Sequence, residues 1–397
     1  PVRNAIAAMQ DEFARYRRAL HSNPQTSYEE KYASTFVQQK LDEWGIAYKT
    51  GYGVTGVVAT IEGENNTSDR AIGLRADMDA LDIDEQTGLD HASQNPGKMH
   101  ACGHDGHTTM LLAAAKYLGE TRNFDGRVHL IFQPAEEGDG GAKTMMKDGL
   151  FDDFSCDSVY AVHNWPWLAR GQIAMREGPI MAAVNEFEIT LHGKGGHAAM
   201  PHNNADPIVA AAHIVTAMQS LISREIDPVD TAVLSITNIN AGTGALNVIP
   251  DRAHISGTVR TFDPQTRDYI EKRMREICEN MTTALNMQDM VMNYWPVIEP
   301  TINTAGGVEQ AASAAAAVVG NDNVDTKIPA CMGGEDFGAF LMEKPGAYIF
   351  LGQGESDNNS PHSQGLHSPF YDFNDEIISL GAEYFTQLVE KALPKTA

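Results

Sequence analysis

A cysteine and a histidine separated by one residue stand near the centre of the segment 99–107. Glycines flank Cys102 and His104 and a helical pattern follows, so a thiolate and an imidazole can point into one cleft. These ligands suit zinc and its first-row neighbours. A structural cysteine beside a helix cap formed by Asp105 is the alternative. His107 falls in the first helical turn, where a structural role is favoured.

Two adjacent glutamates, Glu136 and Glu137, follow an apolar run that ends at Phe132. Successive side chains of a strand point to opposite sides, so one carboxylate can bind a metal while its neighbour faces a substrate water. An exposed acidic loop is the alternative, in a chain with 53 Asp and Glu residues.

The remaining candidates are polar side chains that stand alone. His163 comes directly after the apolar run 159–162, Asp77 and Asp79 follow another such run, and His367 lies near the C-terminus. Taken singly, each has an ordinary structural explanation, such as a satisfied buried histidine or a helix N-cap.

The elements that must position these residues alternate between short apolar strands and helices. Strands are predicted at 57–61, 71–74, 128–132, 159–162 and 347–351, and helices at 6–20, 36–44, 108–118, 142–148 and 376–393. This order predicts an α/β fold with a mostly parallel sheet. In such sheets ligands bind outside the carboxyl ends of the strands, so these strand-end residues are expected to meet there: Asp77 and Asp79, Glu136 and Glu137, and His163. Independent structural explanations do not predict that convergence, and a metal site is therefore favoured.

From about residue 182 the pattern changes to that of a small α+β domain. Strands are predicted at 185–191, 233–239, 253–260 and 290–294, with helices at 206–223 and 264–285. Strand–helix–strand–strand–helix–strand is a ferredoxin-like order. We therefore expect a catalytic domain made of residues 1–181 and 298–397, interrupted by an inserted domain of residues 182–297.

The composition indicates an acidic protein without nucleic-acid or membrane partners. The 397 residues carry 29 Lys and Arg against 53 Asp and Glu, a formal charge of −24, which repels phosphates and anionic lipid surfaces. No apolar run approaches the about 20 residues of a membrane span. The four cysteines lie far apart and the N-terminus has no apolar signal-peptide core, so a cytoplasmic location is expected.

Together the motifs resemble the M20 metallopeptidase family, and most closely its branch of hippurate hydrolases, aminoacylase-like enzymes and indole-acetyl-amino-acid hydrolases. The resemblance covers essentially the whole chain, in the expected order. Its matching segments are 17–21, 74–81, 99–107, 133–138, 162–166, 195–199, 247–251, 333–337 and 366–375. The resemblance implies a catalytic domain with two divalent metal ions and an inserted lid domain through which chains form a homodimer or a tetramer.

The resemblance also implies a metal-ligand set. Its members are Cys102, His104, Glu137, His163 and His367. Cys102 would bridge the two ions, for which zinc, manganese, nickel and cobalt all remain candidates. Glu136 matches the general base of the family, and Asp79 matches a carboxylate that orients a metal ligand.

The remaining implied site residues lie mostly in the inserted domain. His197 would donate a hydrogen bond to the oxyanion of the tetrahedral intermediate, after lid closure or from the partner subunit. Asn247 and Arg260 are candidates for binding the substrate carboxylate, which arginine can do bidentately. Gly334 would line the cleft through its backbone.

The expected activity is hydrolysis of the amide bond of small N-acyl-L-amino acids, either hippurate-like or N-acetylated, with Glu136 as general base. A dipeptidase or carboxypeptidase on the same two metals is the second interpretation, and a non-catalytic metal-binding protein is the third. Glu136 disfavours the third, because a binding module has little need of a base. Asp82 and the pair Gln25-Thr26 depart from the usual pattern of the branch and leave substrate preference open.

Overall fold

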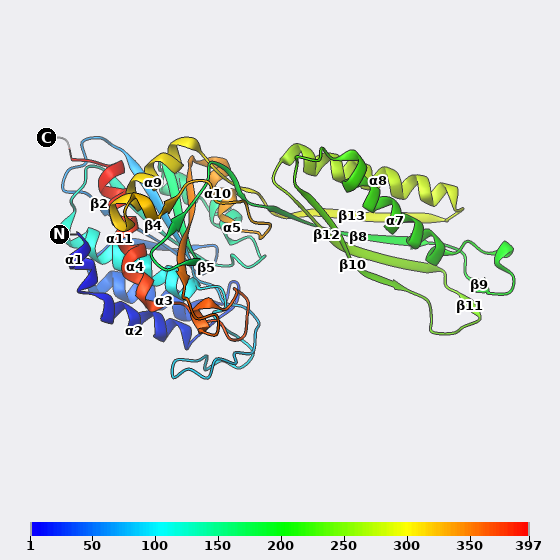
Figure 1. Cartoon of the computed structure of the whole chain (residues 1–397), viewed down its shortest axis with the longest axis horizontal. Coiled ribbons are helices and arrows are strands. Elements are labelled where there is room, and N and C mark those ends of the chain that lie inside the picture. Colours follow the sequence, from blue (N-terminus) through cyan, green and yellow to red (C-terminus); the bar gives the residue numbers. More distant parts are fainter. Residues whose placement is uncertain (1, 396–397) are drawn as a thin grey trace. The chain divides into compact units, whose positions relative to one another are not determined.

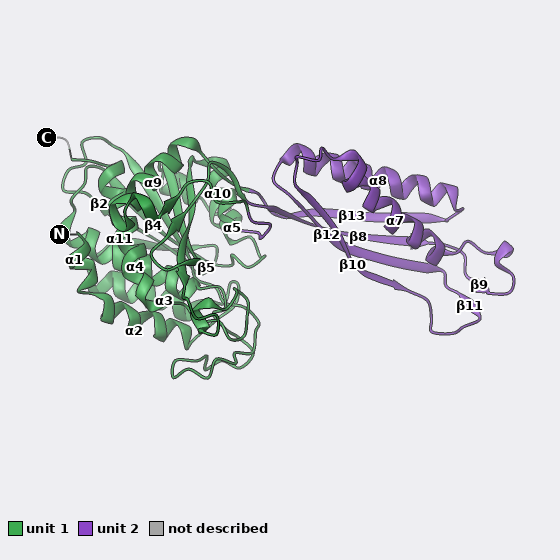
Figure 2. Cartoon of the chain, viewed as in Figure 1, with its two compact units in different colours: residues 1–180, 301–330, 336–397 green, residues 181–300, 331–335 purple. Residues whose placement is uncertain are grey.

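The computed structural model describes residues 2–395, which form two compact units (Figure 1, Figure 2). Unit 1 contains the residues up to Ile180, Thr301–Ala330 and the residues from Asp336 onward, and unit 2 contains Met181–Pro300 and Cys331–Glu335. The short segment Cys331–Glu335 thus groups with unit 2, whereas the sequence placed it within 298–397. None of the helices in residues 2–395 has the length and apolar character that crossing a bilayer requires.

Unit 1 is built on an eight-stranded sheet with the strand order β1-β2-β4-β3-β5-β16-β6-β15. The strands are β1 (Tyr48–Tyr52), β2 (Gly56–Glu62), β3 (Ala71–Asp77), β4 (Arg127–Gln133), β5 (Ser158–Ala169), β6 (Ile173–Ala174), β15 (Val324–Asp325) and β16 (Gly346–Gly354). β3 runs parallel to β4 and β5, and β16 runs parallel to β5. β1 and β2 add an antiparallel edge. The predicted α/β fold with a mostly parallel sheet is confirmed.

Helices bury both faces of this sheet, which explains why every residue of β3 is buried. The helices are α1 (Val2–Ala7), α2 (Gln10–His21), α3 (Lys31–Glu43), α4 (His104–Thr121), α5 (Gly141–Lys147), α6 (Leu150–Asp153), α9 (Ala305–Val319), α10 (Phe337–Glu343) and α11 (Ile378–Ala392), with short 3-10 turns at Asn321–Asn323, Pro361–Ser363 and Asp375–Ile377. Ile72 and Leu74 of β3 share one core cluster with Leu111 of α4 and Leu388 of α11. The pair β7 (Gly178–Met181) and β14 (Thr301–Asn303) forms a separate small sheet.

Unit 2 has the predicted ferredoxin-like order. Its elements are β8 (Ala183–His192), β9 (Gly196–His197), the 3-10 turn Pro201–Asn203, α7 (Pro207–Glu225), β10 (Ala232–Ala241), β11 (Val248–Ile249), β12 (Arg252–Thr261), α8 (Pro264–Ala284) and β13 (Asp289–Ile298). The four long strands are antiparallel in the order β10-β12-β8-β13. Asp206 and Asp263 cap α7 and α8, each followed by the proline that suits the first helical position. α7 and α8 cover one face of the sheet (Figure 1).

Candidate metal centre

The carboxyl ends of β3 and β4 and the middle of their parallel neighbour β5 carry the polar residues of the site. Asp77 is the last residue of β3, and Glu136 and Glu137 follow the end of β4. His163 lies inside β5, opposite Phe350 of β16, because β5 continues to Ala169 and does not end at Val162. The convergence expected from the parallel sheet is present in the structure.

The loop before α4 brings Cys102 and His104 to the same edge. Gly103, between them, has φ +89° and a left-handed backbone. A Cβ at this position would stand 2.2 Å from Oδ1 of Asn164, so only glycine fits here. The segment therefore turns sharply between its two candidate ligands and starts α4 at His104.

The candidate ligand atoms approach one another closely. Cys102 Sγ lies 3.5 Å from His163 Nε2, and His367 Nε2 lies 3.4 Å from Oε1 of Glu137. Two triads each have all ligand atoms within 4.8 Å of one another: Cys102, His104 and His163, and Cys102, Glu137 and His367. Cys102 belongs to both triads, as a ligand shared by two ions must.

The orientation of the imidazoles fits a pair of cations. His104 donates from Nδ1 to the carbonyl of Asp79 at 2.8 Å, and His163 donates from Nδ1 to the carbonyl of Asn164 at 2.7 Å. Each ring therefore presents Nε2, and not Nδ1, to the centre as its ligand atom. Within residues 2–395, the buried atoms His104 Nε2 and Glu137 Oε1 have no hydrogen-bond partner. Such orphaned atoms are rare in native proteins, and a bound ion would satisfy both.

The carboxylates around the centre create a negative potential that favours a bound cation. Burial raises the pKa of the Cys102 thiol well above its ordinary value, and the charges of Glu137 and Glu136 raise it further. Burial lowers the pKa of His104, but Asp77 and other carboxylates outweigh this effect and raise it to about 10. A thiolate ligand forms in such surroundings only when cations offset the carboxylates.

A buried network below the centre joins His107, which was expected to be structural, to Asp77 and Asn164. His107 Nδ1 lies 2.6 Å from Oδ1 of Asp77, and His107 Nε2 lies 2.7 Å from Oδ1 of Asn164. Arg75 donates to Oδ2 of Asp77 at 2.9 Å. Asn164 was not singled out from the sequence, where its only signal is its position next to His163.

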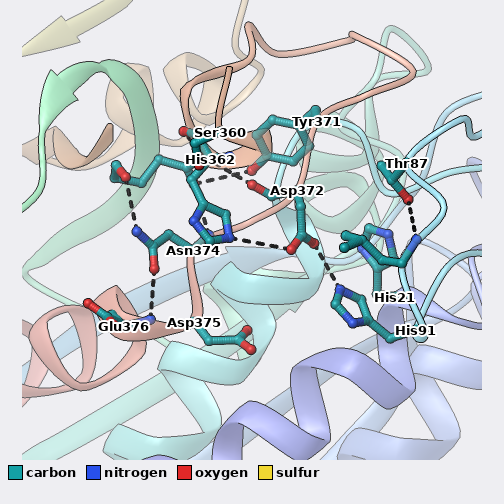
Figure 3. Close-up of polar contacts among 12 residues, drawn as sticks. His21, Thr87, His91, Ser360, His362, Tyr371, Asp372, Asn374, Asp375 and Glu376 are labelled. Carbon is teal, nitrogen blue, oxygen red and sulfur yellow. Dashed lines mark hydrogen bonds and ion pairs between the residues drawn. The ribbon is translucent and has the colours of Figure 1, made fainter. Parts of the chain in front are cut away.

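A second network anchors the segment that presents His367. Asp372 accepts hydrogen bonds from Arg17 at 2.8 Å and His91 at 3.2 Å on Oδ1, and faces His362 at 3.5 Å (Figure 3). Burial raises the pKa of Asp372, but Arg17 and the two histidines hold it well below its usual range. The amide of His367 donates to the carbonyl of Ala101 at 2.8 Å, which ties this segment to the loop that carries Cys102.

The implied residues of unit 2 fall into two separate groups. His197 is exposed in β9, which pairs with β11, and the carbonyl of Asn247 accepts the amide of Ala198 at 3.0 Å. Gly334 lies beside Arg260, because a Cβ on Gly334 would stand 3.9 Å from Nη1 of Arg260.

The two groups lie at opposite ends of β12 (Figure 1). β11 precedes Arg252, where β12 begins, and Arg260 lies near its other end. At about 3.3 Å per residue, β12 separates the groups by about 26 Å.

The parallel-sheet domain places one cysteine in two triads of imidazole and carboxylate ligands, with a further glutamate beside them. This arrangement is typical of a metal-dependent hydrolase. The chain belongs to the family described as Peptidase family M20/M25/M40, which matches residues 73–391. It is an amidohydrolase, an enzyme that acts on amide bonds.

Relatives of this chain agree with the predicted branch. A hippurate hydrolase of Campylobacter jejuni is 41% identical over 388 residues, covering 98% of each chain. An N-acetyl-L-cysteine deacetylase of Bacillus subtilis is 38% identical over 386 residues, which are 96% of this chain and 88% of that protein. The crystal structure of the Bacillus subtilis YXEP protein, described as a dinuclear metal-binding peptidase from the M20 family, matches with TM-score 0.84 and 32% identity, covering 98% of this chain and 100% of that one.

Proposed function

We propose that this protein hydrolyses the amide bond of N-acyl-L-amino acids and releases a carboxylate and a free amino acid. The observation that carries the proposal is the presence of Cys102 in two triads of ligand atoms beside the carboxylate of Glu136. The names of two relatives support the substrate class, because hippurate and N-acetylcysteine are both N-acyl amino acids.

Two divalent cations would complete the site, with Cys102 as the ligand common to both. The proposed ligands are Cys102, His104, Glu137, His163 and His367. When bound, the cations would activate a water molecule and polarise the amide carbonyl. A mixed set of thiolate, imidazole and carboxylate accepts zinc, manganese, nickel or cobalt.

Glu136 is the proposed general base. It is 6% exposed, and its Oε2 lies 3.8 Å from Nε2 of His104. Glu136 is therefore next to the proposed ligands, but it belongs to neither of the two triads that share Cys102. From this position Glu136 takes the proton of the attacking water and delivers it to the leaving nitrogen, so that the amine departs neutral. Asp79 keeps the ring of His104 in place through its carbonyl, at 2.8 Å, and its Oδ1, at 3.2 Å.

His197 and Arg260 are proposed to bind two different groups of the substrate, the amide oxygen and the carboxylate. The amide of Ala199 donates to Nδ1 of His197 at 3.1 Å, so the neutral ring carries its proton on Nε2, where it can donate to the oxyanion. The guanidinium of Arg260 donates to the Thr258 hydroxyl and the Met332 carbonyl, both neutral, and its charge also interacts with that of Glu186. With five N–H donors, the guanidinium can still bind a substrate carboxylate.

The separation inside unit 2 supports a homodimeric active site. An extended N-acyl amino acid spans about 10 Å, much less than the about 26 Å between the two ends of β12. One substrate therefore meets Arg260 of one chain and His197 of the partner subunit. Asn247 would lie beside His197 at this site, because both are at the same end of unit 2. Gly334 would lie beside Arg260 for the same reason. We accordingly propose a homodimer formed through unit 2.

A cytoplasmic location is part of the proposal and is supported by the cysteines. Cys102, Cys156, Cys278 and Cys331 are all free thiols. A reducing compartment preserves such thiols. Fractionation of cells that express the untagged chain would test this location.

The decisive experiment is a hydrolysis screen with controlled metal content. Protein stripped by a chelator is reloaded separately with zinc, manganese, nickel or cobalt and given N-acetyl, N-benzoyl and indole-acetyl amino acids. Dipeptides with the same amide bond and a free amine serve as matched substrates. We expect hydrolysis only after reloading, with the blocked amine preferred.

Two outcomes would contradict the proposal. Faster cleavage of the free-amine dipeptides would favour the dipeptidase or carboxypeptidase interpretation. Absence of hydrolysis in protein that retains two ions per chain by elemental analysis would favour a non-catalytic metal-binding protein.

A further inference from the structure

The turn that presents Glu136 and Glu137 contains a residue in an unfavourable backbone conformation. Ala135 has φ +54° and is fully buried. Residues with a side chain keep this left-handed conformation only where their surroundings hold them in it. The turn therefore depends on contacts from outside its own segment.

One of these contacts comes from Glu30, a fully buried residue 105 positions away in the sequence. Its Oε1 accepts the amide of Ala135 at 2.9 Å and the amide of Tyr28 at 3.0 Å. Its Oε2 accepts the hydroxyl of Thr55 at 2.6 Å. The carboxylate thus joins the start of α3, the loop before β2 and the turn after β4.

Stability of α3 does not explain this buried charge. Glu30 occupies the N-cap position of α3, but its side chain makes no capping hydrogen bond to the helix. Glutamate is also not among the preferred N-cap residues. Burying a carboxylate costs free energy. A carboxylate at this position therefore indicates a role that an apolar side chain could not perform, namely accepting hydrogen bonds from neighbouring segments.

The hydrogen bond from Ala135 is one of two to buried carboxylates, one on either side of Glu136. The amide of Glu137 donates to Oδ2 of Asp79 at 2.9 Å. The carbonyl of Ala135 accepts the amide of Gly141 at 2.9 Å. The backbone before and after Glu136 is therefore tied to buried carboxylates, and this fixes the direction in which the Glu136 side chain leaves the turn.

We propose that Glu30 is a positioning residue for Glu136: its carboxylate holds Ala135 in the left-handed conformation that directs the Glu136 side chain to the metal centre. The inference rests on the proposed function, because it takes Glu136 as the general base. Glu30 itself is not one of the proposed ligands and would act through the backbone of Ala135.

The test compares Glu30→Met with Glu30→Gln. Methionine is similar in length but offers no oxygen, whereas glutamine keeps an acceptor for Ala135 and can donate its amide to the hydroxyl of Thr55. Glu30→Met should lower kcat at least about tenfold, with KM within about threefold and metal content unchanged. Glu30→Gln should keep kcat within about threefold of the wild type.

Hydrogen exchange gives a readout that does not depend on activity. The amide of Ala135 should exchange at least about tenfold faster in Glu30→Met than in the wild type, and at the wild-type rate in Glu30→Gln. Val37→Ala, which opens a cavity beside the buried face of α3, is the stability control and should change neither kcat nor the exchange of Ala135.

Thr55 provides a second test if Glu30→Met does not fold. Thr55→Val removes one of the three donors to the carboxylate and should lower kcat at least about threefold, whereas Thr55→Ser keeps the hydroxyl and wild-type kcat. Wild-type kcat in both Glu30→Met and Thr55→Val would overturn the inference. So would an equal loss in Glu30→Gln or Val37→Ala. A wild-type protein without hydrolytic activity would instead refute the proposed function.

Discussion

Two impaired variants of this chain should restore each other's activity when they share a dimer. His197→Ala removes the proposed oxyanion donor, at a cost of about 10²- to 10³-fold in kcat. Arg260→Ala removes charge-assisted hydrogen bonds to the substrate carboxylate, each worth about 1.5–3 kcal/mol, and should act mainly on KM. The about 26 Å between the two ends of β12 exceeds the about 10 Å of an extended N-acyl amino acid, so one such substrate would not reach both residues of one chain.

In a hybrid dimer of the two variants, one site combines the intact Arg260 of the first chain with the intact His197 of the second. The other site lacks both. A hybrid purified through two different affinity tags should therefore show about half the wild-type kcat/KM per dimer at low substrate, whichever chain supplies the metal centre.

The matched control places both substitutions on one chain and pairs it with a wild-type chain. Each site of that hybrid lacks one residue, so it should be nearly inactive. If both residues of a site came from the same chain, the results would be reversed: the hybrid of single variants would be inactive and the control would be half active. That reversal, or a monomeric active enzyme in sedimentation, would refute the reasoning.

Three further predictions concern the site and its support. Glu136→Ala should lower kcat at least about 10²-fold while metal analysis shows full occupancy, and unchanged turnover would remove Glu136 from its role. Cys102→Ser should lose metal, because a hydroxyl replaces a thiolate; equal occupancy by elemental analysis would contradict this. Burial lowers the pKa of His21, but its hydrogen bonds with Asp105 and Glu85 outweigh this and raise it to about 9. The resulting stabilisation, about 3 kcal/mol, is present below about pH 6.5 and is lost as pH rises through 9, so denaturant unfolding should show an alkaline decline that His21→Asn lacks.

The sheet of unit 1 was predictable where burial is complete. β2, β3 and β4 lie over the predicted runs 57–61, 71–74 and 128–132, because a strand that is buried on both faces is an unbroken apolar run, whether it pairs in parallel, as β3 does, or antiparallel, as β2 does. β1 (Tyr48–Tyr52) was not predicted, since it is an edge strand whose central residues are exposed. α9 (Ala305–Val319) was also missed, because its alanine-rich sequence lacks a clear polar stripe.

Candidate ligands could be found from sequence because each stands in a short local motif, such as the segment 99–107 or the Glu136-Glu137 pair. The partners of those ligands could not, because they are brought together by topology alone. Asn164 contacts His107 and Tyr371, and the latter is 207 residues away. Similarly, 63 residues separate His197 from Arg260, and only the path of β12 reveals that they lie at opposite ends of unit 2.

The different positions of Glu136 and Glu137 have a cause that the sequence did not indicate. Alternation along a strand was the expected reason, but β4 ends at Gln133 and both glutamates follow it in a turn. Both carboxylates lie 3.8 Å from Nε2 of His104, but only that of Glu137 shares a triad with Cys102. This arrangement follows the left-handed backbone at Ala135 and the hydrogen bonds that hold the turn. A general base next to a metal ligand in the sequence therefore needs contacts from outside the motif, here from Glu30 and Asp79, to hold the turn. Two adjacent glutamates after a strand would not be sufficient without these contacts.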